Sequence, residues 1–350
     1  MKVFKYILIL LVVFLISGYF LVQNHSVQNK LFENTVRALF QTNEIFMNDA
    51  LSVAVCGSRA PLPSPNRAET CLLVQAGTSK FIIDTGRGSA DNLQKWRVDY
   101  SDLEAVILSH LHSDHISDLH EVQFQSWLGG RKTPLSVIGP IGTASTAQGF
   151  EQAFKLDSIY RSEHHGAILP IEAYGYDVVE FEGDAKLIFE NEDTKITAFK
   201  VDHSPVDPSY AFKIEYKDRS IVISGDTVSL EVMTEYSKGV DVLFHDALAK
   251  PLIQEMEKIS EEIGNNIVSK VLFDIQDYHA NTVEVADIAR KAEVDLLVFY
   301  HLIPAPRNYI SEQMFLRGVD EIFTNYHVSE DGTLVSLPAD SDEILIDLID

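Results

Sequence analysis

The stretch SHLHSDH, residues 109–115, places four side chains that can bind a metal ion within six positions. It follows the apolar run AVIL, residues 105–108, which predicts a buried strand, so the stretch is expected on a loop at that strand's carboxyl end. Imidazole and carboxylate ligands suit zinc. Four ligands on so short a loop do not easily reach one ion. The spacing therefore favours two ions side by side, with His110 and His112 on one and Asp114 and His115 on the other.

This stretch resembles the His-x-His-x-Asp-His signature of the metallo-β-lactamase superfamily. The resemblance implies an α/β fold, an αββα sandwich with a dinuclear zinc site along one edge. It also implies three further ligands in the order His, Asp, His. Their candidates are His203 in VDHSP, Asp226 in ISGDT as the bridging ligand, and His301 in LVFYH. The match extends from about residue 51 to residue 301 and resembles most the ribonuclease Z and arylsulfatase-like branch.

The resemblance also implies roles for residues beside the metal. Asp84 stands where the family has an aspartate that hydrogen-bonds a ligand histidine, and a turn-capping role is the alternative. His245, in the sequence HDA, is the candidate proton donor, unless it is a structural histidine at a strand end. His279 is expected to support the site or to contact the substrate. Arg87, like Arg59, is either a contact for an anionic substrate or a solvated loop arginine.

The reaction that the resemblance implies is hydrolysis of a phosphodiester or a sulfate ester. A hydroxide bridging two Zn²⁺ ions would attack the ester, Asp226 would bind both ions, and His245 would protonate the leaving group. Asp114, inside the signature, completes the expected catalytic group. The alternatives are a lactonase or β-lactamase-type hydrolase, a tRNA 3′-processing endoribonuclease, and a membrane-tethered binding domain without catalysis. A di-iron oxidoreductase is disfavoured because that branch usually has Glu where His112 stands.

Two features argue against a nucleic-acid partner. His203 and Asp226 are 23 residues apart, which leaves room for one hairpin, whereas ribonuclease Z carries a long arm that grips tRNA between these ligands. The formal net charge is −24, with 28 basic and 52 acidic residues, and nucleic-acid binding relies on Lys and Arg neutralising phosphates. We therefore expect a small anionic ester as substrate and no nucleic acid. The oligomeric state stays open.

The N-terminal segment predicts attachment to a membrane or transport across one. Lys2 and Lys5 precede an uncharged apolar run over residues 6–22, slightly short for a spanning helix but within range. Because a clean cleavage site is lacking, an uncleaved anchor over residues 1–23 is favoured over a cleaved signal peptide. Residues 24–48 are expected to form a stalk and residues 49–350 the hydrolase domain. The lysines favour a cytoplasmic N-terminus. The catalytic domain is then expected in the periplasm, anchored to the inner membrane or, after cleavage, secreted.

Two cysteines, Cys56 and Cys71, end one predicted strand and begin the next. They match neither a zinc-ribbon nor a redox Cys-x-x-Cys pattern. Outside the cytoplasm a disulfide could close the loop between them, whereas buried free thiols are equally compatible with the sequence. The redox state of the two residues stays open.

Overall fold

The computed structural model describes residues 2–349 of the chain. The chain forms two compact units, Met1–Asn43 and Glu44–Asp350. Each unit has its own internal contacts, and the second carries all of the residues singled out above as site candidates.

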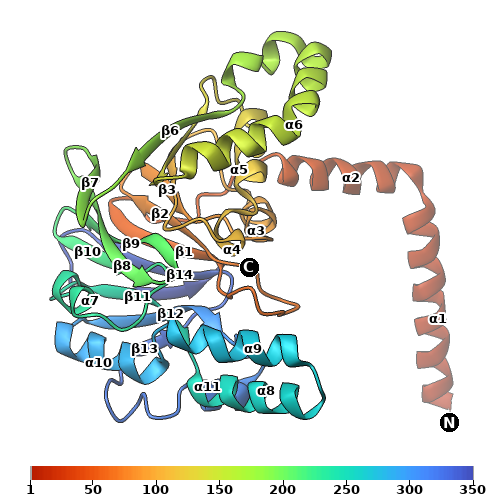
Figure 1. Cartoon of the computed structure of the whole chain (residues 1–350). Coiled ribbons are helices and arrows are strands. Elements are labelled where there is room, and N and C mark those ends of the chain that lie inside the picture. The colour runs from red at the N-terminus through yellow and green to blue at the C-terminus, as the bar shows by residue number, and fades with distance from the viewer. Residues whose placement is uncertain (1, 350) are drawn as a thin grey trace. The chain divides into compact units, whose positions relative to one another are not determined.

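The first unit contains helices α1 (Lys2–Gln23) and α2 (His25–Leu39), drawn in red in Figure 1. Among the described residues, α1 is the one helix long and apolar enough to cross a membrane, over Phe4–Gln23. A signal sequence has the same length and composition, so the helix does not by itself distinguish an anchor from a leader.

Two sheets make up the second unit. The first has the strand order β15-β14-β1-β2-β3-β4-β5-β6 and the second the order β13-β12-β11-β10-β9-β8-β7. The strands of the first sheet are β1 (Ala50–Gly57), β2 (Cys71–Ala76), β3 (Ser79–Ile83), β4 (Leu103–Ile107), β5 (Leu135–Pro140), β6 (Tyr176–Phe181), β14 (Thr333–Pro338) and β15 (Leu345–Leu348). Those of the second sheet are β7 (Ala185–Glu190), β8 (Thr194–His203), β9 (Val206–Tyr216), β10 (Arg219–Ile223), β11 (Val242–Leu248), β12 (Leu296–Ile303) and β13 (Tyr326–Val328).

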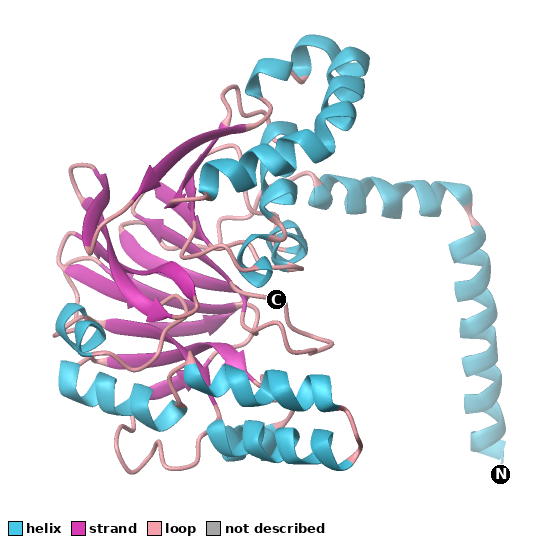
Figure 2. Cartoon of the chain, in the orientation of Figure 1, coloured by secondary structure: helices cyan, strands magenta, loops and turns pink. Residues whose placement is uncertain are grey.

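Helices cover the outer faces of both sheets (Figures 1 and 2). The helices of this unit are α3 (Ser89–Lys95), α4 (Ser113–Ile116), α5 (Leu119–Leu128), α6 (Thr143–His165), α7 (Glu231–Tyr236), α8 (Lys250–Glu262), α9 (Asn266–Asp274), α10 (Thr282–Ala292) and α11 (Tyr309–Phe315). Because successive side chains of a strand point to opposite faces, each strand supplies two cores. Along β11, Val242 and Phe244 belong to the core between the sheets, whereas Leu243 packs in the core under α10. The result is an α/β sandwich, as the signature implies.

Parallel pairing brings the carboxyl ends of the central strands to one edge of the sandwich. In the first sheet β3, β4, β5 and β6 run parallel, and in the second β10, β11, β12 and β13 do. In open α/β sheets ligands bind beyond the carboxyl ends of such strands. The metal-binding signature follows β4 and lies at this edge.

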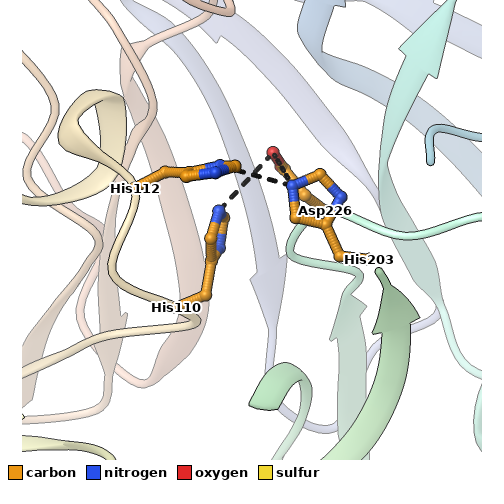
Figure 3. A group of neighbouring side chains, drawn as sticks. All are labelled: His110, His112, His203 and Asp226. Carbon is orange, nitrogen blue, oxygen red and sulfur yellow. Dashed lines mark hydrogen bonds and ion pairs between the residues drawn. The ribbon is translucent and has the colours of Figure 1, made fainter. Parts of the chain in front are cut away.

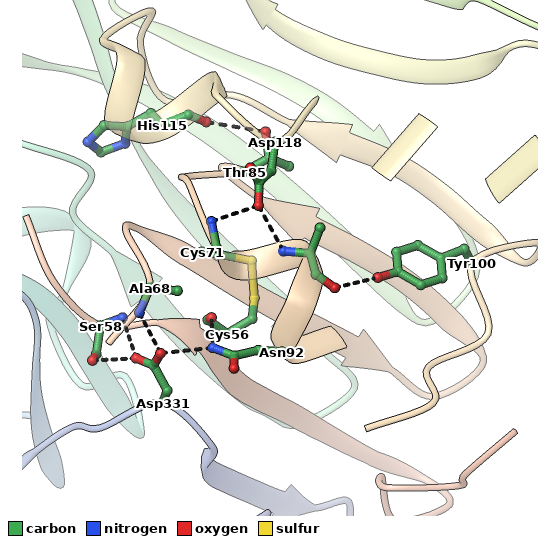
Figure 4. Close-up of a disulfide and its surroundings, with 12 residues drawn as sticks. Cys56, Ser58, Ala68, Cys71, Thr85, Asn92, Tyr100, His115, Asp118 and Asp331 are labelled. Carbon is green, nitrogen blue, oxygen red and sulfur yellow. Dashed lines mark hydrogen bonds between the residues drawn. A yellow bond between two sulfur atoms is a disulfide. The ribbon is translucent and has the colours of Figure 1, made fainter. Parts of the chain in front are cut away.

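Cys56 and Cys71 form a disulfide, which resolves the alternative that the sequence leaves open (Figure 4). The two residues are fully buried at the start of the β1–β2 pairing, where Gly57 lies opposite Cys71. The loop between them is further held by Asp331, which accepts hydrogen bonds from the backbone N–H groups of Ser58 and Ala68. The bridge therefore closes a loop, residues 57–70, that is fixed at both of its ends.

Candidate metal centre

The first group of metal-capable side chains joins the two sheets (Figure 3). His110 and His112 come from the loop after β4, His203 ends β8, and Asp226 follows β10. One potential ligand atom of each lies within 4.8 Å of those of the other three. His203 Nε2 is 3.4 Å from His112 Nδ1, and Asp226 Oδ2 is 3.8 Å from His110 Nε2. Three imidazoles and a carboxylate thus converge on one point.

The second group lies beside the first and consists of Asp114, His115 and His301. His301 Nε2 is 3.3 Å from Asp114 Oδ2, and His115 Nε2 is 3.7 Å from the same oxygen. Asp226 reaches this group too, because its Oδ2 lies 3.3 Å from His115 Nε2 and 3.2 Å from His301 Nε2. A single carboxylate oxygen therefore lies within 4 Å of imidazole nitrogens in both groups.

Several side-chain atoms of these residues are buried without a hydrogen-bond partner. They are His110 Nε2, His115 Nε2, Asp226 Oδ1 and His301 Nδ1. Buried polar atoms in proteins are nearly always paired, and each unpaired one costs free energy. A cation between the two groups would satisfy most of them at once. The donor set, five histidines and two aspartates, therefore fits metal ions, and imidazole with carboxylate suits zinc.

Neighbouring groups fix the tautomers of the histidines. The Nδ1–H of His115 donates to Asp84 Oδ2 at 2.8 Å, which leaves Nε2 facing the cluster. Asp84 also accepts from the backbone N–H and the hydroxyl of Ser109, at 2.8 and 2.7 Å. The Nδ1–H of His203 donates to the carbonyl of Tyr278 at 2.9 Å. Such contacts orient the imidazole and raise its basicity toward a metal. The sequence did not point to Tyr278, because a backbone carbonyl leaves no signal in the residue type.

The backbone adopts positive φ values at two residues of the site. Asp84 and His301 have φ values of 58° and 45°, a region that non-glycine residues seldom adopt and that recurs at functional sites. Gly225, with φ of 59°, precedes Asp226, and a Cβ there would lie 2.5 Å from the carbonyl oxygen of Tyr210. A side chain at residue 225 would therefore displace Asp226.

The histidines of the two groups differ in the direction in which their pKa values are shifted. Burial lowers the pKa values of His110, His112 and His203, so these imidazoles are neutral near pH 7. Burial also acts to lower the pKa values of His115 and His301, but the nearby carboxylates, Asp226 first among them, raise both. For Asp226 itself burial acts to raise the pKa, yet the imidazoles around it hold the pKa well below its usual value.

His245, the candidate proton donor, and His279, expected to support the site or to contact the substrate, lie in different places. His245 is fully buried, and its position in β11 next to Leu243 and Ala247 turns it toward the core under α10. Its Nδ1–H donates to the carbonyl of Asp246 at 2.8 Å. His279 instead lies against the cluster, with its ring centroid 4.9 Å from that of His203 and 5.4 Å from that of His301. Its Nδ1–H donates to Asp246 Oδ2 at 2.9 Å.

The two arginines expected at the mouth of the site are both engaged by Glu69. Arg59 Nη1 is 3.1 Å and Arg87 Nη2 3.0 Å from Glu69 Oε1. Arg59 is buried, and its guanidinium also donates to the carbonyls of Ala60 and Arg67, which makes it a structural element of the loop. The Arg87 side chain is 68% exposed, so it keeps donors that face solvent.

Curated ribonuclease Z sequences are similar to this chain over most of its length. Ribonuclease Z of Mycobacterium bovis (strain BCG / Pasteur 1173P2) is 34% identical over 261 residues, which cover 73% of this chain and 87% of the relative. Ribonuclease Z of Mycobacterium marinum (strain ATCC BAA-535 / M) matches to the same extent. The chain is a ribonuclease Z-like member of the metallo-β-lactamase superfamily. This confirms the superfamily and branch that the signature implies. Residues 57–286 of this ribonuclease Z-like protein also match the family model described as Anti-Pycsar protein Apyc1, so it belongs to that family as well.

Solved structures share the fold of the ribonuclease Z-like protein at low sequence identity. The metallo-β-lactamase fold protein YhfI from Bacillus subtilis superposes with a TM-score of 0.61 and 20% identity, covering 82% of this chain and 100% of that one. Human tRNase Z, short form, gives a TM-score of 0.59 and 19% identity, covering 82% and 99%. Together with the clusters of metal-capable side chains, the relatives support a metal-dependent hydrolase.

The expectation that excludes nucleic acid as a partner is wrong. The relatives are named for ribonuclease activity, and the family assignment rests on them. The net charge of −24 sums the whole chain and carries no information about the few residues that meet a substrate. The second argument concerned the arm, and the structure has only β9 and β10 between His203 and Asp226. This ribonuclease Z-like protein thus lacks that arm, but the lack of an arm does not exclude a nucleic-acid substrate.

Proposed function

We propose that this protein is a zinc-dependent phosphodiesterase that binds two metal ions and hydrolyses nucleotide phosphodiesters. The observation that carries the proposal is Asp226 Oδ2, which lies within 4 Å of His110, His115, His203 and His301 and so joins the two groups of ligands. Metal ions bound here would supply Lewis acidity toward the phosphoryl group and acidify a bound water.

The side chains of the chain itself would divide the remaining work. His110, His112 and His203 would hold one ion and Asp114, His115 and His301 the other, with Asp226 between them. Asp84 and the carbonyl of Tyr278 would keep Nε2 of His115 and His203 turned toward the metals. These contacts fix the site before substrate arrives, which is how preorganised groups lower a barrier.

His279 is the better candidate for the proton donor, in place of His245. It lies beside both ligand groups, and its Nδ1–H is held by the buried carboxylate of Asp246, so Nε2 is the nitrogen left to meet a leaving oxygen. A general acid must lie within hydrogen-bond reach of the atom that it protonates. His245 faces the helix layer instead. Its Nδ1 lies 3.0 Å from Asp246 Oδ1, so its role is to hold the carboxylate of Asp246 in place.

The test uses the full chain in detergent, loaded with zinc, on bis(p-nitrophenyl) phosphate and p-nitrophenyl sulfate side by side. His112→Ala is the disabling variant and His165→Ala, at the exposed end of α6, its matched control. Phosphodiester hydrolysis that disappears only in His112→Ala, with two zinc ions per wild-type chain, is the expected result. Faster hydrolysis of the sulfate ester, or no hydrolysis of either substrate with zinc bound, would contradict the proposal.

A second candidate function is tRNA 3′-end processing, and the 34% identity to ribonuclease Z over 73% of the chain favours it. The same assay distinguishes it when a precursor tRNA is added as a third substrate. Cleavage of that precursor at the 3′ end, at a rate above that for a small diester, would make the protein an endoribonuclease. Turnover of the small diester without cleavage of the precursor would contradict this second function.

We further propose that α1 anchors the protein and that the catalytic unit works outside the cytoplasm. The apolar helix over Phe4–Gln23 and the disulfide Cys56–Cys71 support this, since disulfides persist in oxidising compartments. External protease should digest the catalytic unit in spheroplasts and spare it in intact cells. A soluble cytoplasmic protein with two free thiols would overturn the proposal.

A further inference from the structure

A polar cavity of about 170 Å³ opens beside His279, next to the candidate metal centre. It lies at the edge where the parallel strands β10, β11 and β12 end, the same edge that holds the metal-capable residues. Its lining includes Ser229, three residues past Asp226, and Lys250, which begins α8 directly after β11. The cavity therefore adjoins the candidate metal centre through His279, whose ring lies against those of His203 and His301.

Backbone hydrogen bonds hold the three chain segments around this cavity together. Leu248 N–H donates to the carbonyl of Ala280 at 2.9 Å, and Ala280 N–H donates to the carbonyl of Thr227 at 2.8 Å. The segments after β10 and β11 are thus tied to the segment that carries His279. A cavity with a fixed frame keeps its shape when empty, as small-molecule sites usually do.

The lining offers hydrogen-bonding groups of both signs. Lys250, an exposed residue of the lining, supplies an ammonium group that can donate hydrogen bonds. The Oδ1 of Asn281 accepts from the N–H groups of Val283 and Glu284, so its NH₂ group remains for a ligand. The Nε2 of Gln276 donates within the protein, which leaves its carbonyl oxygen. Glu284 adds a carboxylate that balances the lysine.

Such a lining suits a neutral group rich in hydroxyls better than a second phosphate. One cation against one carboxylate gives no net attraction for an anion, whereas amide, ammonium and carboxylate groups together bind hydroxyls as donors and acceptors. The cavity has no aromatic side chain in its lining on which a base could stack, apart from the imidazole of His279. A sugar-sized polar group fits both the chemistry and the volume.

We propose that this cavity, beside His279, is the subsite for the leaving alcohol of the phosphodiester and selects a sugar-bearing leaving group. The inference rests on the proposed function, in which His279 protonates the leaving oxygen. His279 lines the cavity on one side and contacts the rings of His203 and His301 on the other. A phosphorus atom at the metals would therefore place its leaving oxygen at His279 and the attached alcohol in the cavity.

The test compares leaving groups on the zinc-loaded full chain. Bis(p-nitrophenyl) phosphate has no sugar, a dinucleoside monophosphate expels a nucleoside, and thymidine 5′-(p-nitrophenyl phosphate) keeps its sugar on the phosphorus side. Lys250→Met should raise KM about tenfold for the dinucleoside substrate alone, with kcat nearly unchanged, because it removes one charged hydrogen-bond donor. Ser229→Trp, at an exposed position, should block the cavity and have the same selective effect. Lys258→Met, elsewhere on α8, is the control.

Each outcome decides between separate claims. Inhibition of bis(p-nitrophenyl) phosphate turnover by the product nucleoside, weakened in Lys250→Met, would support the subsite without relying on KM. A loss confined to thymidine 5′-(p-nitrophenyl phosphate) would place the retained nucleotide in the cavity and overturn the assignment to the leaving group. Equal effects on all substrates, or none, would overturn the subsite while the phosphodiesterase stands. No hydrolysis of any diester would instead overturn the proposed function.

Discussion

The two halves of the candidate metal centre share Asp226 but differ in how they are built. The half with His110, His112 and His203 has neutral imidazoles, and His112 is partly exposed. The half with Asp114, His115 and His301 is buried, and the carboxylate of Asp84 supports it at 2.8 Å. The pKa values of the imidazoles are lowered in the first half and raised in the second, so a cation competes with protons more strongly in the second half. Equivalent ligand counts do not make equivalent sites.

Removal of the shared residue should give the largest effect. In Asp226→Ala both halves lose their common oxygen, so we expect activity below detection and a fall in bound zinc at both positions. Metal content by mass spectrometry and diesterase turnover check this. Asp157→Ala on α6, a surface aspartate paired with Arg161, is the matched control. A variant that kept one ion at full affinity would show that the halves do not share Asp226.

The second-largest effect is expected at His279, whose ring lies against a ligand of each half, His203 and His301. His279→Gln should lower kcat by about 10²–10⁴-fold for an alkoxide leaving group, because general-acid catalysis is typically worth that much. The loss should be far smaller with p-nitrophenolate, which leaves without a proton. His245→Gln, whose imidazole faces the helix layer, should change both substrates alike through Asp246. If His245→Gln alone showed the dependence on leaving group, the assignment of the donor would be reversed.

The sequence predicted which residues meet, because the ligands stand at ends of apolar runs and those runs become adjacent strands. It could not rank His245 against His279. Both flank the same acidic residue in space, and only the alternation of β11 shows that His245 points to the helices. It could not decide between a Cys56–Cys71 disulfide and two free thiols either, since the distance between the two residues depends on the register between β1 and β2. The charge argument failed for another reason, because a sum over 350 residues says little about one edge of the fold.

A smaller effect is expected from Asp84→Asn, which acts on one half alone. The amide would no longer hold the Nδ1–H of His115 as a charged acceptor does, and loss of such partners typically lowers metal affinity by about 10–100-fold. Zinc titration against a competing chelator should show one weakened ion and one unchanged ion. Uniform weakening of both would contradict the separation of the halves.

The pH dependence of metal binding should show the smallest difference. Carboxylates raise the pKa values of His115 and His301 in the metal-free protein, so an ion entering that half displaces a proton and its affinity rises with pH. One displaced proton gives a change of about tenfold per pH unit. The other half, whose imidazoles have lowered pKa values, should vary little above pH 7. Chelator competition between pH 6 and pH 8 measures both slopes, and parallel slopes would contradict this account.

The bridge between Cys56 and Cys71 links the lifetime of the protein to its location. Its residues are 15 positions apart, and closing a loop of that size restricts the unfolded chain by about 3 kcal/mol. Typical domains are stable by only about 5–15 kcal/mol, so a copy kept among reduced thiols would unfold more often and meet proteases sooner. A hydrolase able to cut a cell's own phosphodiesters would thus be short-lived wherever its cysteines stay apart.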